Sequence, residues 1–213
     1  MNIQSLIDKA LEPSKEPRKR SGKFSPSSFG NCFRRQIWNR QDKPVSDPPD
    51  LEGLKRMAQG KATHKFIQQY LPKDIVEVLI EIEDIKGYAD IVLLDSVEDI
   101  KCMDEWKFKK YWNIPSKEYI FKNTYSFYQP VWYALELKKA KAVLRGHIFG
   151  TFKCVRHEVY ISDWKEKIEE ELKTLRGWWK SGEIPPAEPR LYNGSECVYC
   201  NWRTVCKKTK EVK

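Results

Sequence analysis

Three cysteines near the carboxyl end constrain this chain more than any other feature of its sequence. Cys197, Cys200 and Cys206 form a Cys-x₂-Cys-x₅-Cys pattern. Thiolates this close together, on so short a loop, can wrap around one metal centre. Such a centre needs a fourth ligand, and Cys32, far upstream, is the best candidate. We therefore expect the two chain ends to meet at a four-cysteine site that holds either zinc or an iron–sulfur cluster.

The composition indicates a folded, basic protein. The 213 residues are 40% hydrophobic and include 8 Trp, 10 Tyr and 9 Phe, which is too apolar for a disordered chain. The net charge of +9 favours a polyanionic partner, with nucleic acid first, although good solubility alone would also explain it. No apolar run has the length of a membrane span, and the first residues do not resemble a secretory signal. We expect a cytoplasmic protein with no membrane partner.

The hydrophobic pattern alternates between helical and strand periods. Helices are expected within 25–47, 50–71, 116–138 and 163–180, and strands at 75–82, 87–94, 99–108, 141–152 and 153–161. This order predicts an α/β fold with a mixed central sheet flanked by helices. We divide the chain into a basic extension (1–24), a core that includes Cys32 (25–184), and a cysteine segment with a basic tail (185–213).

Two acidic residues and a lysine in the strand region indicate metal-dependent chemistry. Asp90 lies on the second predicted strand, and Glu105 and Lys107 lie two residues apart on the third, where they project to one face. Neighbouring carboxylates repel each other unless a cation lies between them, and Mg²⁺ or Mn²⁺ takes such oxygen ligands. A lysine beside the ion can position or deprotonate water and stabilise a phosphate transition state. The set predicts phosphodiester hydrolysis, although Glu-x-Lys alone is common on solvated strands.

These residues resemble the core motif of the PD-(D/E)XK nuclease superfamily. Gly60-Lys-Ala-Thr-His64 resembles the upstream helix motif of its RecB-type branch, whose histidine contributes to the metal site. Gln129-Pro-Val-Trp-Tyr133 resembles the Gln-x-x-x-Tyr motif, and residues four apart share a helix face. Pro130 departs from a regular helix at this point. The resemblance implies a restriction-endonuclease-like core, with metal ligands His64, Asp90 and Glu105, and with Lys107, Gln129 and Tyr133 as further catalytic residues.

The cysteine pattern extends this resemblance. One amino-terminal cysteine followed far downstream by Cys-x₂-Cys-x₅-Cys is similar to the iron–sulfur RecB-like nucleases, which include the CRISPR-associated exonucleases that process spacer precursors, the AddB nuclease domain and related viral enzymes. The resemblance implies a [4Fe–4S] cluster on Cys32, Cys197, Cys200 and Cys206, in a domain formed by the two chain ends. It also implies a DNA exonuclease that acts on single-stranded ends, in the 5′→3′ direction, in DNA processing such as CRISPR spacer acquisition. An integrase or a recombination protein would be its partner.

Lysines and aromatic residues alternate over residues 107–122. Such a mixture can hold single-stranded nucleic acid, with cations on phosphates and rings against bases; alternatively, the rings are buried in a core and the lysines are solvated. Two other functions stay open. The first is a non-catalytic DNA-binding or assembly subunit with the same fold, and the second is a viral recombination or genome-processing nuclease. We expect Cys102 and Cys154, in apolar strands, to be buried and structural, and His147 and His157 to be structural or at the surface.

Overall fold

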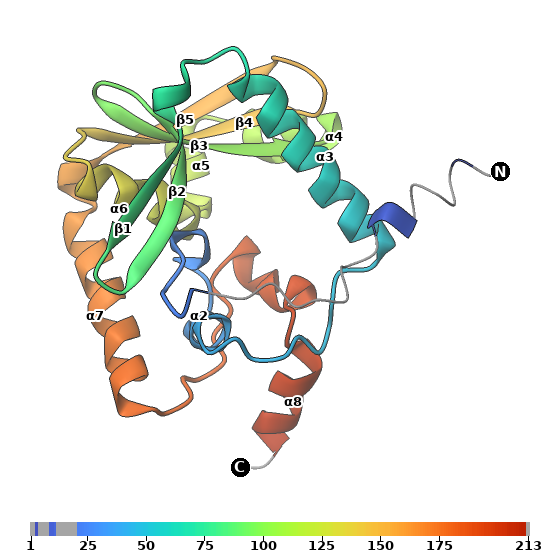
Figure 1. The fold of residues 1–213 in the computed structure, drawn as a ribbon, viewed down its shortest axis with the longest axis vertical. Coiled ribbons are helices and arrows are strands. Elements are labelled where there is room, and N and C mark those ends of the chain that lie inside the picture. Colours follow the sequence, from blue (N-terminus) through green and yellow to red (C-terminus); the bar gives the residue numbers. More distant parts are fainter. Residues whose placement is uncertain (1–2, 4–8, 12–20, 212–213) are drawn as a thin grey trace.

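The computed structural model of the chain describes residues 3, 9–11 and 21–211 (Figure 1). Most of the basic extension predicted over 1–24, and the last two residues of the basic tail, lie outside these residues. The strands are β1 (Val76–Ile82), β2 (Ile85–Val92), β3 (Ser96–Met103), β4 (Lys141–Ile148) and β5 (Cys154–Tyr160). The main α-helices are α2 (Phe33–Arg40), α3 (Leu51–Gln68), α5 (Ser116–Lys122), α6 (Tyr128–Glu136), α7 (Lys165–Ser181) and α8 (Arg203–Glu211).

Shorter helical segments connect these elements. They are η1 (Pro26–Ser28), η2 (Lys73–Ile75), α4 (Glu105–Lys107), the π-helical η3 (Phe108–Trp112), η4 (Thr124–Phe127), η5 (Ile161–Asp163) and η6 (Tyr192–Tyr199). Among the described residues, no helix is long and apolar enough to cross a membrane.

The described strands form one mixed five-stranded sheet. Its order is β1-β2-β3-β4-β5, and β3 and β4 are parallel while the other neighbours are antiparallel. A parallel pair needs a long crossover, and α4 to α6 supply it between β3 and β4. The sequence prediction of a mixed sheet flanked by helices is confirmed.

Two apolar clusters hold helices against this sheet. The larger one joins α6 and α7 to β1, β2 and β4, with Val131, Leu144 and Leu175 fully buried. The smaller one joins α3 to the sheet through Ile67, Ile91 and Ile100. In Figure 1, α3 accordingly lies away from α6 and α7. The sheet therefore has helices on both sides, and its strands carry the candidate active site between them.

The predicted strand over 99–108 is too long. β3 ends at Met103, and Asp104 caps the next helical turn because its Oδ1 accepts a hydrogen bond of 2.8 Å from the Lys107 N–H. Glu105 and Lys107 therefore lie on the helical turn α4, and they do not lie on a strand beside Asp90. The side-chain cap overrides the alternating pattern that suggested a longer strand.

Two predicted helices are interrupted. The single helix expected over 25–47 is η1 followed by α2, and the helix expected over 116–138 is α5, η4 and α6. Pro130 is the third residue of α6. Because the first-turn N–H groups of a helix have no partner within the helix, proline is tolerated there, and the helix that carries Gln129 and Tyr133 is regular after it.

Candidate active site and cysteine site

The register of β2 and β3 brings two aspartates and a lysine to one face of the sheet. Val92 pairs with Val97 across the two antiparallel strands, so the side chains of this pair project to the same face. Side chains alternate along a strand, which places Asp90, Asp99 and Lys101 on that face as well. The sequence Asp99-Ile100-Lys101 thus repeats, on a real strand, the acid-x-lysine spacing that we assigned to Glu105 and Lys107.

Lys101 lies between an acid and an amide. Its Nζ is 2.7 Å from Asp99 Oδ2, and it donates a hydrogen bond of 3.4 Å to Gln129 Oε1 on α6. The carboxylate of Asp99 is buried, with its residue 2% exposed, whereas the lysine side chain is 41% exposed. The Lys101 side chain is thus held beside a buried carboxylate and remains partly exposed to solvent.

His64, Glu77 and Asp90 form the candidate metal site. One ligand atom from each of them lies within 4.8 Å of the others, and among the described residues these are the His, Cys, Asp and Glu side chains that come together in this way. The Ile100 N–H donates to Asp90 Oδ2 at 2.7 Å, and Gln68 Nε2 donates to Glu77 Oε1 at 2.9 Å. The two carboxylates are therefore oriented by the neighbouring strand and by α3.

Burial controls the charges at this site. It raises the pKa of Asp90 to about 7, with a further contribution from the charge of Asp99. Burial also lowers the pKa of His64, so the 3.8 Å approach of its Nδ1 to Asp90 Oδ2 joins a largely neutral imidazole to the carboxyl group. A neutral imidazole is the form that binds metal. The carboxylates repel each other in a site that a divalent cation would stabilise.

Tyr133 lies against the same acidic pair. Burial and the charges of Asp99 and Asp90 raise the pKa of its phenol far above the usual value, so the hydroxyl keeps its proton. A Cβ atom added to Gly87 on β2 would collide with Tyr133 Oη, and it would lie 2.8 Å from Pro26 Cδ. Gly87 thus makes room for the tyrosine hydroxyl beside the sheet.

The structure brings together His64, Asp90, Gln129 and Tyr133, but not Glu105 and Lys107. The Glu105 side chain is 59% exposed and pairs with Lys109 Nζ at 2.8 Å on its own helical segment. The expected placement of these two residues on a strand beside Asp90 is wrong, because β3 ends before it reaches them. Asp99 and Lys101 have the same acid-x-lysine spacing on β3, beside Asp90, and the tripeptide that contains them was visible in the sequence. Glu77 belongs to no motif, and no sequence signal indicated it.

Glu77 has an unusual backbone. Its φ angle is +50°, inside β1, a conformation that costs a non-glycine residue about 1–2 kcal/mol. Such strain persists where the surroundings fix it, and it is frequent at functional sites. Here the strain accompanies a carboxylate turned toward His64 and Asp90.

The four cysteines of the predicted Cys₄ site line one cavity of about 160 Å³. Arg34, Arg35, Arg203 and Lys207 line it too, and Arg34 Nη1 donates to Cys206 Sγ at 3.3 Å. The thiols do not form a group within 4.8 Å of one another, whereas bonds of 2.3 Å to a tetrahedral zinc ion would hold the sulfur atoms about 3.8 Å apart. The donors and the basic lining fit an anionic cluster, and that four-cysteine cluster stays a prediction.

Of the remaining cysteines and histidines, His147 and His157 are buried, Cys102 is half-buried and Cys154 is exposed. Burial raises the pKa of Cys102 to about 12, so this thiol is unreactive. His157 is buried, and its Nε2 lies 2.9 Å from the carbonyl oxygen of Trp112. His147 is also buried. Cys154, in contrast, is exposed, and its predicted burial is wrong because it lies on the outer strand of the sheet.

The Lys–aromatic stretch divides between core and surface. Phe108 and Tyr119 are buried, whereas Tyr111 and Phe121 are exposed. Lys110 Nζ lies 4.5 Å from the centroid of the exposed Trp106 ring. Part of the stretch is therefore core, as the alternative interpretation held, and the exposed rings and lysines are available to a ligand.

Comparisons with known proteins agree with this fold. No protein-family model matches the chain, and no curated protein sequence matches it. The crystal structure of SSO0001 matches with a TM-score of 0.61 and 19% identity, covering 97% of this chain and 96% of that one. At this identity the likeness shows the fold alone.

Two weaker matches are structures of an alkaline exonuclease, LHK-Exo, from Laribacter hongkongensis. One has a TM-score of 0.48 at 15% identity and covers 76% of this chain and 90% of that chain. The other, a complex with dAMP, has a TM-score of 0.43 at 16% identity and covers 76% and 89%. These likenesses are too distant to bear on the function.

Proposed function

We propose that this chain is a metal-dependent nuclease that hydrolyses phosphodiester bonds in DNA. The observation that carries the proposal is the convergence of Asp90, Asp99 and Lys101 on one face of the sheet, with Lys101 held 2.7 Å from Asp99. A stable fold does not require a buried acid and a half-buried acid that repel each other beside a partly exposed lysine. A site that holds a divalent cation next to a phosphate does require them.

The residues present fit a Mg²⁺ or Mn²⁺ ion. Asp90, Glu77 and the neutral His64 offer the oxygen and imidazole donors that such ions accept. When bound, a divalent cation stabilises negative charge on the phosphate and lowers the pKa of a water molecule. Glu105, which we expected among the ligands, points to solvent and has no place in this set.

The chain's own residues supply the remaining chemistry. Water forms a bond to phosphorus and gives up a proton to solvent, while the bridging P–O bond breaks and the leaving oxygen takes up a proton. Negative charge develops on the phosphate oxygens in the transition state. Lys101 supplies positive charge for that transition state and orients the attacking water. Gln129 acts as a positioning residue because it accepts from the Lys101 ammonium group. Tyr133, which keeps its proton, supplies a neutral hydrogen-bond donor beside the acids.

The proposal includes a [4Fe–4S] cluster on Cys32, Cys197, Cys200 and Cys206. Support comes from the single cavity that the four thiols share and from the basic side chains that line it. Protein purified without oxygen should contain about four iron atoms per chain and show a broad visible absorption band. One zinc atom without iron would overturn this part of the proposal and leave the nuclease part intact.

The finer form of the proposal concerns the substrate and the pathway. We infer an exonuclease that acts on single-stranded DNA ends in the 5′→3′ direction, in DNA processing such as CRISPR spacer acquisition. Exposed rings and lysines on the stretch after β3 support single-stranded binding, since such side chains contact bases and phosphates. The partner would be an integrase or a recombination protein, in the cytoplasm, where a reducing environment keeps thiols free.

Cleavage of labelled DNA with matched substitutions tests the nuclease proposal. Lys101→Met and Asp99→Asn should lower cleavage in Mg²⁺ or Mn²⁺ by at least about 10²-fold while leaving most DNA binding intact. Lys107→Met and Glu105→Gln, which make the same changes on exposed residues, should cut within about twofold of the unaltered protein. If Lys107→Met is inactive and Lys101→Met is active, the original assignment is right. Labels on the 5′ and 3′ ends read the polarity in the same assay.

Two rival functions have their own discriminating observations. A non-catalytic DNA-binding or assembly subunit would bind DNA without cutting it in either metal. A viral recombination or genome-processing nuclease would cut DNA, and its gene would neighbour replication or packaging genes. A neighbouring integrase gene would instead support spacer acquisition.

A further inference from the structure

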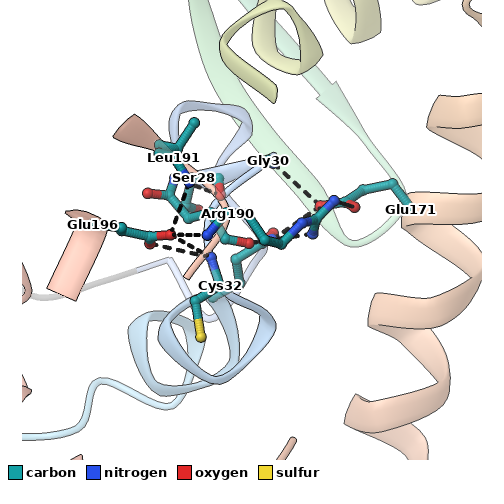
Figure 2. Close-up of polar contacts among 9 residues, drawn as sticks. Ser28, Gly30, Cys32, Glu171, Arg190, Leu191 and Glu196 are labelled. Atoms are coloured by element: carbon teal, nitrogen blue, oxygen red, sulfur yellow. Dashed lines mark hydrogen bonds and ion pairs between the residues drawn. The ribbon is translucent and has the colours of Figure 1, made fainter. Parts of the chain in front are cut away.

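A buried carboxylate fixes the backbone of Cys32. Glu196 is 1% exposed, and both of its oxygens accept from the Cys32 N–H at 3.1 Å. Its Oε2 also accepts from the Arg190 N–H at 3.1 Å (Figure 2). Its Oε1 lies 3.3 Å from Arg35 Nη1. Glu196 immediately precedes Cys197. A side chain from the cysteine segment therefore hydrogen-bonds to the backbone of Cys32, near the other end of the chain.

A second buried carboxylate holds the residues just before Cys32. Glu171 on α7 accepts from the Gly30 N–H at 3.2 Å, and it forms an ion pair of 2.6 Å with Arg190 Nη2. Gly30 has a φ angle of +76°, and a Cβ atom there would collide with the carbonyl oxygen of Tyr125. The backbone of residues 30–32 is therefore held by both acids and by the glycine that this conformation requires.

The sulfur of Cys32 is left available. In Figure 2, it points away from both the Glu196 and the Glu171 carboxylates, and Cys32 lines the cavity with the other three cysteines. The contacts of Glu196 thus involve the backbone of Cys32 and leave its side chain free for a ligand.

Other contacts join the two chain ends without a metal. Arg34 Nε donates to the Pro185 carbonyl oxygen at 2.7 Å, and Trp202 Nε1 donates to the Pro44 carbonyl oxygen at 3.0 Å. The Ser46 and Asp47 N–H groups donate to the Asn201 carbonyl oxygen at 3.0 and 2.9 Å. In Figure 1 the red carboxyl-terminal segment accordingly lies beside α2.

We propose that Glu196 is a positioning residue that presents Cys32 as a preformed fourth ligand, so that the chain ends stay joined when the cluster is absent. This inference rests on the proposed cluster, because it concerns the residue that prepares the site for it. The cluster would then bind to an organised cavity, and binding would not have to fold the two ends.

Glu196→Gln and Glu188→Gln form the matched pair for the test. Both remove one carboxylate from the same segment, but Glu188 is exposed. An amide at position 196 would turn an NH₂ group toward backbone N–H donors. Loss of such an outer partner typically lowers metal affinity 10- to 100-fold. We therefore expect Glu196→Gln, at a temperature where it stays folded, to release iron to a chelator at least about tenfold faster than Glu188→Gln or the unaltered protein.

The metal-free protein gives the second measurement. After anaerobic removal of iron, the unaltered chain should keep its far-ultraviolet circular dichroism and resist trypsin at Arg190 and Arg203. Rapid cutting there, or release of iron from Glu196→Gln at the unaltered rate, would overturn the inference. If the unaltered protein binds no iron, the cluster proposal fails. Resistance to trypsin would still show whether the two chain ends are joined without a metal.

Discussion

The acidic centre and the cysteine site are built in different ways. Asp90 and Asp99 are brought together by the register of two adjacent strands, and one backbone hydrogen bond, from Ile100, orients the first of them. Cys32 and Cys197 come from opposite ends of the chain and are brought together by buried carboxylates that accept backbone N–H groups. Sheet register places the first site, and side-chain contacts place the second.

This difference has consequences for stability. A pair of strands loses little stability when one surface side chain changes, because the backbone hydrogen bonds between the strands remain. A buried carboxylate that loses its cationic partner becomes an uncompensated charge, which is costly. The cysteine site should therefore be the more fragile of the two regions, and the following predictions test that contrast.

The largest effect is expected for Arg190→Met. Arg190 pairs with Glu171 at 2.6 Å, with side chains 11% and 2% exposed. Breaking a buried pair by removing one partner costs about 3–5 kcal/mol, and urea unfolding would measure it. Arg176→Met, which removes an arginine 41% exposed from its pairs with Glu83 and Asp84, 70% and 26% exposed, is the control and should cost clearly less than Arg190→Met. Equal losses for the two variants would contradict the contrast.

An intermediate effect is expected for Gln129→Ala in the acidic centre. Lys101 would lose the acceptor that holds its ammonium group, and we expect cleavage to fall about tenfold, which is about 1.4 kcal/mol at the transition state. DNA affinity and iron content should not change. Steady-state cleavage kinetics report on the acidic centre, and iron analysis reports on the cysteine site. A loss of iron would show that the two regions are coupled.

A small effect on folding is expected for Cys32→Ser in the metal-free state. Contacts that need no metal join the chain ends, so the metal-free variant and the metal-free unaltered protein should unfold within about 1 kcal/mol of each other in urea. The iron-loaded proteins should differ clearly, since only the unaltered chain carries a full set of ligands. A large difference between the metal-free forms would assign a folding role to the thiol itself.

The smallest effect is expected for Asp47→Asn. Hydrogen bonds from the Thr204 side chain and backbone lower the pKa of Asp47 from 3.8 to about 2, and the carboxylate caps α8. A lowered pKa contributes stability that is complete above about pH 4 and is lost as the pH falls toward 2. The thermal midpoints of the variant and the unaltered protein should therefore differ slightly at pH 6, differ less at pH 3 and converge near pH 2. A difference that grows on acidification would contradict this sign.

The sequence predicted the order of the elements, but not the strand end on which the candidate active site depends. Asp99-Ile100-Lys101 and Glu105-Trp106-Lys107 have the same acid-x-lysine spacing, and hydrophobic alternation cannot choose between them. The choice depends on the cap that Asp104 forms, a contact of one side chain with one N–H group. The end of a strand depends on whether such a side-chain cap or the next strand hydrogen bond is more stable. The hydrophobic periodicity of the sequence does not contain this information.

The cysteine site shows the opposite balance. The short spacing of Cys197, Cys200 and Cys206 indicated that these three lie together, and Cys32, predicted as the fourth ligand, lines the same cavity. The residues that organise this cavity, Glu196 and Glu171, belong to no motif and look like ordinary surface acids in the sequence. Their partners include backbone groups more than 100 positions away, and only the folded chain brings these groups together.

Close packing around Gly87 makes the residues at positions 26, 87 and 133 depend on one another. A side chain at 87 would meet the Tyr133 hydroxyl on one side and the Pro26 ring, 2.8 Å away, on the other. Replacing Tyr133 by phenylalanine would remove only one of the two obstructions. In a family of related chains, a larger residue at 87 should therefore appear only together with changes at both 26 and 133. Selection would act on the three positions as a unit, and a library that varies them singly would find almost no survivors at position 87.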